Sequence, residues 1–243
     1  MTNRISEVFG VPRVLLPVVH PVTREAALES VAVSSDAGVK GIFLINQGLS
    51  AEEVLELVMT VRDRHPSLWV GINLLGVPVA EVLARGLAAC GGRLDGIWVD
   101  TAQIDEGARA QPAAQAFVDA RREHGWNGLY FGGVAFKYQR AVSDDMLGAA
   151  SAAALPFMDV VCTSGPGTGK EADVAKVIAM RRGMGEGGAL ALASGVTDQN
   201  VGEYLPYVDA YLVGTGIEKD FGVLDPVKVA RLHRIVAAYA APS

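Results

Sequence analysis

The sequence contains 243 residues, of which 50% are hydrophobic and 20% are charged. Such a composition indicates a folded protein with a sizeable core rather than a disordered chain. The chain carries 21 Lys and Arg residues against 27 Asp and Glu residues, a net charge of −6. An acidic chain is a poor partner for nucleic acid or an anionic membrane surface, although it can still hold one site for a small anion.

Neither a membrane-spanning segment nor a secretory signal is indicated. No apolar run approaches the roughly 18 to 20 residues that a transmembrane helix needs, and the first residues lack the charged-then-apolar pattern of a signal peptide. The two cysteines, Cys90 and Cys162, are far apart in the chain, so they predict neither a disulfide scaffold nor a zinc site. We therefore expect a cytoplasmic protein without membrane insertion and without a metal centre.

Eight short apolar runs are spaced along the whole chain. Each run is continuously apolar rather than alternating, which is typical of strands covered on both faces in a parallel sheet. Pro17 lies inside the first run, where a strand tolerates proline only at an edge or a bulge. The runs cover residues 14–19, 41–45, 68–72, 96–99, 128–131, 158–162, 189–193 and 210–213.

Helical patterns fill the gaps between these runs. Ser50 and Glu53 form a capping-box pair at the start of one helix. Asp225 followed by Pro226 is typical of the start of another, because proline fits the first helical turn. Three further N-cap candidates are Thr23, Ser143 and Thr197.

Eight strands, each followed by a helix in a unit of about 30 residues, predict a single (β/α)8 barrel over residues 1–243. An open, doubly wound α/β sheet is the alternative. The eight equal units and the lack of a dinucleotide-binding fingerprint disfavour it. No Pro/Ser-rich linker or charge run divides the chain into two domains.

Polar side chains follow nearly every predicted strand. In a (β/α)8 barrel the chemistry lies at the carboxyl ends of the strands, so these side chains are expected at one mouth. Turns after any strand are also polar, an explanation that suits asparagine and serine better than His20, Asp100 and Lys137. The strand-end residues are His20, Asn46, Gln47, Asn73, Asp100, Thr101, Lys137, Thr163, Ser164, Ser194, Gly195, Gly214 and Thr215.

A glycine-rich segment, residues 163–170 with the sequence TSGPGTGK, follows the sixth strand. It is not a Walker A loop, because Glu171 stands where Ser or Thr is needed. It is not a dinucleotide-binding turn either, because Lys170 stands where the third glycine would be. Glycines allow the backbone to fold into a nest of N–H groups around an anion. The alternative is a mobile surface loop.

The loops after the seventh and eighth strands favour the anion site. Residues 194–197 are expected to open a helix, whose N–H groups and dipole then point at the mouth. A phosphate held between these two loops is a recurrent feature of such barrels, so we predict a phosphate site at the carboxyl-terminal mouth of the strands. The expected substrate- and phosphate-binding residues are Asn46, Asn73, Ser164, Gly165, Gly167, Thr168, Gly169, Ser194, Gly195, Gly214 and Thr215.

At these segments the sequence resembles the BtpA family of phosphate-binding TIM barrels, which also includes SgcQ-like proteins. The resemblance spans most of the chain, is strongest from Cys162 onward, and implies the barrel and a phosphorylated ligand. Names within the family refer to photosystem I biogenesis and to phosphoribosyltransferase-like activity, so the resemblance fixes no reaction. It rests on the segments VVH (18–20), VGIN (70–73), TSGPGTG (163–169), SGVTDQNV (194–201), VGTGIEK (213–219) and DPV (225–227).

Two segments depart from the family pattern. The first loop, residues 20–23, lacks the longer Pro/Gly segment typical of the family, and the stretch after Asp100 is short. Both lie beside the expected site, so the substrate can differ as well.

Lys137, Asp100 and His20 are the predicted catalytic residues. A lysine in a barrel mouth can act as a Schiff-base nucleophile or as a cation for a phosphate or an oxyanion, and Lys137 matches the strand-five lysine of the family. Asp100 suits a general base, a ribose-hydroxyl acceptor or, if the substrate is a pyrophosphate, a ligand of Mg²⁺. His20 suits proton transfer near neutral pH. Structural roles are the alternative for each: a solvated lysine, a helix cap and a hydrogen-bonded histidine.

These residues predict an enzyme that acts on a small phosphorylated metabolite, either a sugar phosphate or a nucleotide-related compound. Phosphoribosyl transfer and lyase or isomerase chemistry are both compatible with them. The alternative is a non-catalytic assembly or regulatory protein of the BtpA type that uses the barrel as a ligand sensor. No cofactor is expected apart from the conditional Mg²⁺, and homo-oligomerisation stays open because no heptad pattern indicates it.

Overall fold

Eight parallel strands close into one barrel in the computed structural model, which describes residues 3–239. Neighbouring strands follow chain order, and the first strand also pairs with the eighth. This architecture confirms the predicted (β/α)8 barrel. The strands are β1 (Val14–Val19), β2 (Gly41–Ile45), β3 (Trp69–Asn73), β4 (Gly96–Val99), β5 (Leu129–Gly133), β6 (Val160–Ser164), β7 (Ala189–Ala193) and β8 (Ala210–Val213).

The predicted strand bounds hold for β1, β2, β4, β7 and β8. β3, β5 and β6 end one or two residues later than expected, because sheet pairing continues into their polar or glycine-containing ends. Asn73 pairs in register with Ile45, and Ser164 pairs with Ala193. Pro17 does not interrupt β1, where it lies in register with Val213 of β8.

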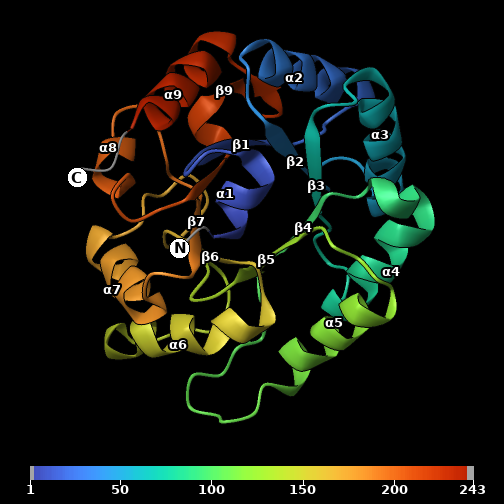
Figure 1. The fold of residues 1–243 in the computed structure, drawn as a ribbon. Helices are drawn as coiled ribbons and strands as arrows, with labels where there is room; N and C mark the ends of the chain where they lie inside the picture. Colours follow the sequence, from blue (N-terminus) through green and yellow to red (C-terminus); the bar gives the residue numbers. More distant parts are fainter. Residues whose placement is uncertain (1–2, 240–243) are drawn as a thin grey trace.

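Helices form a ring outside the barrel, as Figure 1 shows. They alternate with the strands because each crossover between parallel strands needs a connecting segment on the outer face. A two-stranded antiparallel hairpin, β9 (Glu218–Asp220) and β10 (Val223–Leu224), lies between β8 and the last helix. The helices are α1 (Arg4–Phe9), α2 (Arg24–Asp36), α3 (Ala51–Arg64), α4 (Val79–Cys90), α5 (Pro112–Glu123), α6 (Leu147–Ala154), α7 (Val174–Met184), α8 (Val201–Tyr204) and α9 (Pro226–Ala238).

Three of the predicted helix starts are confirmed. Thr23 accepts a hydrogen bond from the Ala26 amide at the start of α2, and Ser50 and Glu53 form both bonds of the capping box at α3. The Asp225 carboxylate accepts from the Val227 and Lys228 amides at the start of α9.

Two predicted caps are wrong. The Ser143 side chain makes no capping bond, because a 3₁₀ turn at Asp144–Met146 precedes α6. Thr197 does not open a helix: the chain continues in turns to Asn200, which is the N-cap residue of α8. Because α8 contains only four residues and starts beyond Asn200, it directs no helix dipole at residues 194–197, contrary to the prediction.

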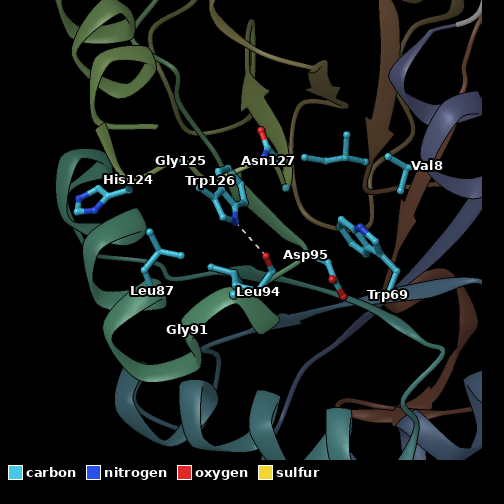
Figure 2. Close-up of a pocket in the computed structure, with 13 residues that line it drawn as sticks. Val8, Trp69, Leu87, Gly91, Leu94, Asp95, His124, Gly125, Trp126 and Asn127 are labelled. Carbon is cyan, nitrogen blue, oxygen red and sulfur yellow. Dashed lines mark hydrogen bonds between the residues drawn. The ribbon is translucent and has the colours of Figure 1, made fainter. Parts of the chain in front are cut away.

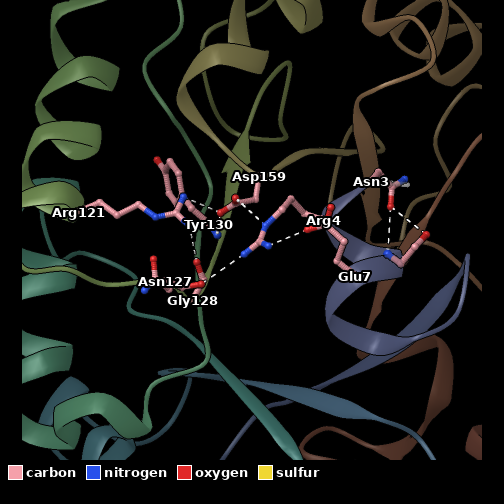
Figure 3. Close-up of polar contacts among 9 residues, drawn as sticks. Asn3, Arg4, Glu7, Arg121, Asn127, Gly128, Tyr130 and Asp159 are labelled. Carbon is pink, nitrogen blue, oxygen red and sulfur yellow. Dashed lines mark hydrogen bonds and ion pairs between the residues drawn. The ribbon is translucent and has the colours of Figure 1, made fainter. Parts of the chain in front are cut away.

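Helix α1, which the strand and helix pattern did not predict, covers the amino-terminal end of the barrel (Figure 1). Its buried residues are Ile5 and Phe9, and the Phe9 ring meets Trp69 edge-on at 5.4 Å. Arg4 pairs with Asp159 at 3.4 Å, as Figure 3 shows. The helix therefore closes the end of the barrel that lies opposite the predicted site.

The barrel interior is lined by aromatic rings from β2 to β5. Phe43 packs edge-on against Phe131, with ring centroids 5.1 Å apart, and also contacts Trp69 and Trp98. Gly96 is required here, because a Cβ at this position would lie 2.2 Å from the Trp69 indole. On the opposite side of the interior β6, β7 and β8 contribute small residues, among them Cys162, Ala191, Ala193 and Ala210.

Both cysteines are buried and form no disulfide, Cys90 on α4 and Cys162 inside β6. Burial raises the pKa of each thiol, which fits packing rather than reactive residues. None of the helices within residues 3–239 combines the length and the apolar character needed to span a bilayer.

Candidate functional site

The predicted strand-end residues lie at the same end of the barrel, because all eight strands run parallel. His20 directly follows β1, Asn46 follows β2 and Asp100 follows β4, whereas Asn73 and Ser164 are the last residues of β3 and β6. Ser194 and Gly214 begin the loops after β7 and β8. The candidate site is therefore the carboxyl-terminal mouth.

Lys137 joins the loops after β5, β6 and β7. Its backbone amide donates to Ser164 Oγ at 2.8 Å, and its ammonium donates to Ser194 Oγ at 2.6 Å. Thr168 Oγ1 lies 3.4 Å from the same ammonium. Ala135 and Tyr138, on either side of Lys137, have φ values of 48° and 62°. These left-handed residues bend the loop sharply enough to turn Lys137 back over the mouth.

Asp100 and Lys137 form an electrostatically coupled pair. Burial lowers the pKa of Lys137, and the negative charge of Asp100 opposes that shift. Burial raises the pKa of Asp100, and this shift is opposed by Asn73, whose amide donates to Asp100 Oδ1 at 2.9 Å, and by the charge of Lys137. Burial therefore favours the uncharged form of both groups more than water does, a property found at many sites of proton transfer.

The loops after β6 and β7 pack together because two glycines leave room for the same carbonyl. A Cβ at Gly165 or at Gly195 would lie 2.2 Å from the carbonyl oxygen of Lys170. The two loops are also linked through Asn200, whose side-chain amide donates to Glu171 Oε2 at 3.2 Å and to the Gly195 carbonyl at 2.8 Å. These contacts make the glycine-rich segment part of a packed site and disfavour a purely mobile loop.

Backbone donors are present at this junction. Ser194 and Gly195 both have a φ of 72°, a left-handed conformation that serine adopts rarely. Within residues 3–239 the amides of Gly195, Gly214 and Gly216 donate to no acceptor. They are therefore available to an anion. The Thr168 amide is committed to Tyr138 Oη at 3.0 Å, which leaves the Thr168 hydroxyl as its contribution.

His20 is held by a carboxylate that the sequence did not single out. Nδ1 of the buried His20 lies 2.6 Å from Oε1 of Glu218, which is also buried. The Phe221 ring stacks on the imidazole, with centroids 5.2 Å apart. On the Gly214 side the fit is tight, because a Cβ there would lie 2.4 Å from His20 Cε1. Nδ1 is thus occupied, and Nε2 makes no hydrogen bond within the described part of the chain.

Lys176 on α7 also went unnoticed in the sequence, where it reads as an ordinary helix lysine. Its ammonium donates to the Ala135 carbonyl at 2.5 Å and to the Ser164 carbonyl at 2.8 Å. Burial lowers its pKa. Through these bonds Lys176 holds the backbone at Ala135, two residues before Lys137, and at Ser164, which accepts from the Lys137 amide.

Some predicted residues have their polar groups occupied by the protein. The Asn46 side chain donates to the Leu75 carbonyl at 3.0 Å and accepts from the Leu75 amide, so it holds the loop after β3. The Ser164 hydroxyl accepts from the Lys137 amide and donates to the Gly165 carbonyl at 2.9 Å. Both are positioning residues in this geometry. Direct ligand contact stays a prediction for all the expected binding residues: Asn46, Asn73, Ser164, Gly165, Gly167, Thr168, Gly169, Ser194, Gly195, Gly214 and Thr215.

The mouth is hollow on the side of β3, β4 and β5. One cavity of about 640 Å³ lies between the loops after β4 and β5. A smaller one of about 170 Å³ lies beside it against the loop after β3. Asp100, Thr101 and Gln139 line both cavities. We call the two cavities together the hollow; Asp100 forms part of its wall.

Another pocket, of about 670 Å³, lies at the opposite end of the barrel (Figure 2). Trp69 begins β3, and Asp95 and Asn127 come just before β4 and β5. All three are therefore at the amino ends of strands, away from the predicted chemistry. Within residues 3–239, no three His, Cys, Asp or Glu side chains are grouped closely enough to hold a metal ion.

The family resemblance indicated by the sequence motifs is confirmed by comparison with known protein families. A profile of the BtpA family matches residues 63–241. The chain belongs to the BtpA family. The matched region includes β3 to β8, and with them Asp100, Lys137 and all three glycine-containing loops. A comparison with curated proteins gave no significant match.

Solved structures with the same barrel include three enzymes of low sequence identity. Phosphoribosyl anthranilate isomerase from Thermus thermophilus has 16% identity and a TM-score of 0.62, with 93% of this chain and 98% of that chain covered. Orotidine 5′-monophosphate decarboxylase from Methanocaldococcus jannaschii, complexed with the inhibitor BMP, has 14% identity, a TM-score of 0.66 and coverages of 94% and 100%. (S)-3-O-geranylgeranylglyceryl phosphate synthase from Thermoplasma acidophilum, in complex with sn-glycerol-1-phosphate, has 10% identity, a TM-score of 0.67 and coverages of 98% and 100%. At these identities the likeness establishes the fold alone.

Proposed function

We propose that this BtpA family protein is an enzyme that acts on a small phosphorylated metabolite, a sugar phosphate or a nucleotide-related compound. The observation that carries the proposal is the placement of the Lys137 ammonium, 2.6 Å from Ser194 Oγ and 3.4 Å from Thr168 Oγ1, in the glycine-containing loops after β7 and β6. A cation, two hydroxyls and the glycine amides of these loops are a donor set that suits a phosphate dianion.

Each residue has a defined role in the proposal. The amides of Gly195 and Gly214 and the hydroxyls of Ser194 and Thr168 bind the phosphate, and Lys137 supplies positive charge. Asp100 accepts a proton from the substrate, because burial keeps this carboxyl basic while Asn73 fixes its orientation. His20 Nε2 provides a second proton-transfer group.

The names of the structural neighbours support the substrate class. A phosphoribosyl compound, a nucleoside 5′-monophosphate and a glycerol phosphate all carry a phosphate monoester, and these appear in the names or bound ligands of the three enzymes. The three chemistries differ from one another, so the neighbours support a phosphate monoester and do not select a reaction.

Titration calorimetry with inorganic phosphate and ribose 5-phosphate tests the proposed site. Both ligands are expected to bind the wild-type protein. Loss of one charged hydrogen bond costs about 1.5 to 3 kcal/mol, so Lys137→Ala is expected to weaken binding roughly 10- to 100-fold. Lys40→Ala is the matched control, because Lys40 is exposed and directly precedes β2 at the opposite end of the barrel. Equal binding by the two variants would remove the phosphate site from this mouth.

Borohydride trapping separates the reaction types. In lyase chemistry through a Schiff base, reduction in the presence of dihydroxyacetone phosphate leaves a covalent adduct on Lys137, which peptide mass spectrometry detects. Absence of the adduct eliminates the Schiff-base route and leaves acid–base or transfer chemistry. A pure ligand sensor, in contrast, would retain its biological activity in the Asp100→Asn variant, which keeps the proposed phosphate-binding groups, and that result would refute the enzymatic proposal.

A further inference from the structure

The hollow beside Asp100 carries negatively charged side chains, whereas the proposed phosphate site carries the positive charge of Lys137. Two carboxylates line it, that of Asp100 directly after β4 and that of the exposed Asp105 in the loop that follows. Phe136, Ile104 and Val142 add apolar surface. The phosphate side of the mouth has the opposite character, with the Lys137 ammonium and free backbone amides.

Among residues 3–239, Arg140 is the one cation that lines the larger cavity, and it is already paired with a carboxylate. Arg140 forms hydrogen bonds to both carboxylate oxygens of Glu106 and donates to the Ile104 carbonyl at 3.1 Å. This bidentate pairing lowers the pKa of Glu106 and raises that of Arg140. Arg140 therefore has less capacity to bind a ligand anion, and two carboxylates stand against this one paired cation among the charged side chains that line the cavity.

The carboxylates in the hollow also favour a ligand group that donates hydrogen bonds. Asp100 Oδ1 accepts from Asn73, Asp100 Oδ2 accepts no hydrogen bond within residues 3–239, and a carboxylate can only accept. Thr101 Oγ1 accepts from the Gln103 amide at 3.1 Å. The Thr101 hydroxyl and the side-chain amides of Gln103 and Gln139, which also line the hollow, can donate as well as accept. The two carboxylates are therefore the lining groups that favour a ligand with hydrogen-bond donors of its own.

We infer that this hollow holds the end of the substrate remote from the phosphate, and that it selects hydroxyl or amino groups against a second phosphate or a carboxylate. The inference rests on the proposed phosphate site and narrows its substrate class to monophosphates of polyols, amino sugars or nucleosides. Bisphosphates and phosphorylated carboxylic acids are disfavoured, because a second anion in the hollow would face Asp100 and Asp105, and Arg140, the cation among the described lining residues, is paired with Glu106.

A pair of probes that differ at one carbon tests the inference. Sorbitol 6-phosphate and 6-phosphogluconate have the same chain length, but the first ends in a hydroxymethyl group and the second in a carboxylate. Calorimetry is expected to show sorbitol 6-phosphate binding at least about tenfold more tightly. Asp100→Asn and Asp105→Asn are each expected to reduce this ratio by improving the binding of 6-phosphogluconate. Asp36→Asn, an exposed aspartate at the end of α2, is the control and is expected to leave the ratio unchanged.

Equal affinity for the two probes, or a preference for 6-phosphogluconate, would overturn the inference while leaving the phosphate site in place. An unchanged ratio in both Asp100→Asn and Asp105→Asn would overturn it too. Failure of both probes and of inorganic phosphate to bind would instead refute the proposed function, and the inference with it.

Discussion

His20 Nδ1 lies 2.6 Å from Glu218 Oε1, and this contact connects the end of β1 to the hairpin that follows β8. The Gly222 amide donates to the same Glu218 oxygen at 3.2 Å, and the Glu218 carbonyl accepts from Lys228 at the start of α9. The pair therefore links the first strand of the barrel to the segment that follows the last strand, and it fixes the imidazole at the mouth. A histidine oriented by a carboxylate has one nitrogen occupied and the other directed to its function.

A double-mutant cycle measures this coupling. His20→Gln and Glu218→Gln are each expected to lower the free energy of unfolding by about 1 to 3 kcal/mol, because each leaves a buried polar group without its partner. The double variant is expected to lose less than the sum, with an interaction energy of about 0.5 to 3 kcal/mol. Urea denaturation supplies the four values. Strict additivity would show that the two residues act independently.

The pKa of Lys137 is expected to fall further in Asp100→Asn. Burial lowers this pKa in the wild-type protein, and the charge of Asp100 partly opposes the shift. Neutralising residue 100 removes the opposition and leaves the effect of burial. A pH titration of ¹³C-dimethylated lysines by NMR follows the Lys137 signal, with Asp36→Asn as the control. A rise or no change in the pKa would contradict the coupling of the pair.

Asp100→Asn is also expected to change how stability depends on pH. Because burial raises the pKa of Asp100 above its ordinary value of 3.8, the folded protein holds this proton more tightly than the unfolded chain. The carboxyl then supports folding fully below pH 3.8 and loses that contribution as the pH rises through its folded pKa. At pH 7 the variant is expected to unfold at a higher urea concentration than the wild type. The difference should vanish below pH 3.8. A variant that is less stable at pH 7 would contradict the sign.

Most of the barrel could be predicted from the sequence because its strands are continuous apolar runs. The carboxyl ends of β3, β5 and β6 were predicted too early, because strand pairing extends there into polar or glycine residues. A pattern of apolar residues cannot reveal that a polar residue such as Asn73 is buried and paired in a strand. Helix α1 was missed because its six residues carry only two core positions, Ile5 and Phe9. The extent of the domain, residues 1–243, stays a prediction.

The site was predictable where one residue follows one strand. Asp100 and His20 directly follow β4 and β1, and Lys137 comes four residues after the end of β5. Glu218 and Lys176 reach the mouth from a hairpin and from α7, so only the folded arrangement shows their contacts. The chain forms turns at the predicted helix start at residue 197, so the expected helix dipole is absent there. The loop amides are therefore the proposed backbone donors.

A crystal structure of the protein with ribose 5-phosphate at saturating concentration would locate the phosphate group. We expect phosphate density within hydrogen-bond distance of Lys137 Nζ, Ser194 Oγ and the amides of Gly195 and Gly214, with the sugar extending toward Asp100. Phosphate bound elsewhere, or an empty mouth at saturation, would refute the phosphate site proposed at this mouth.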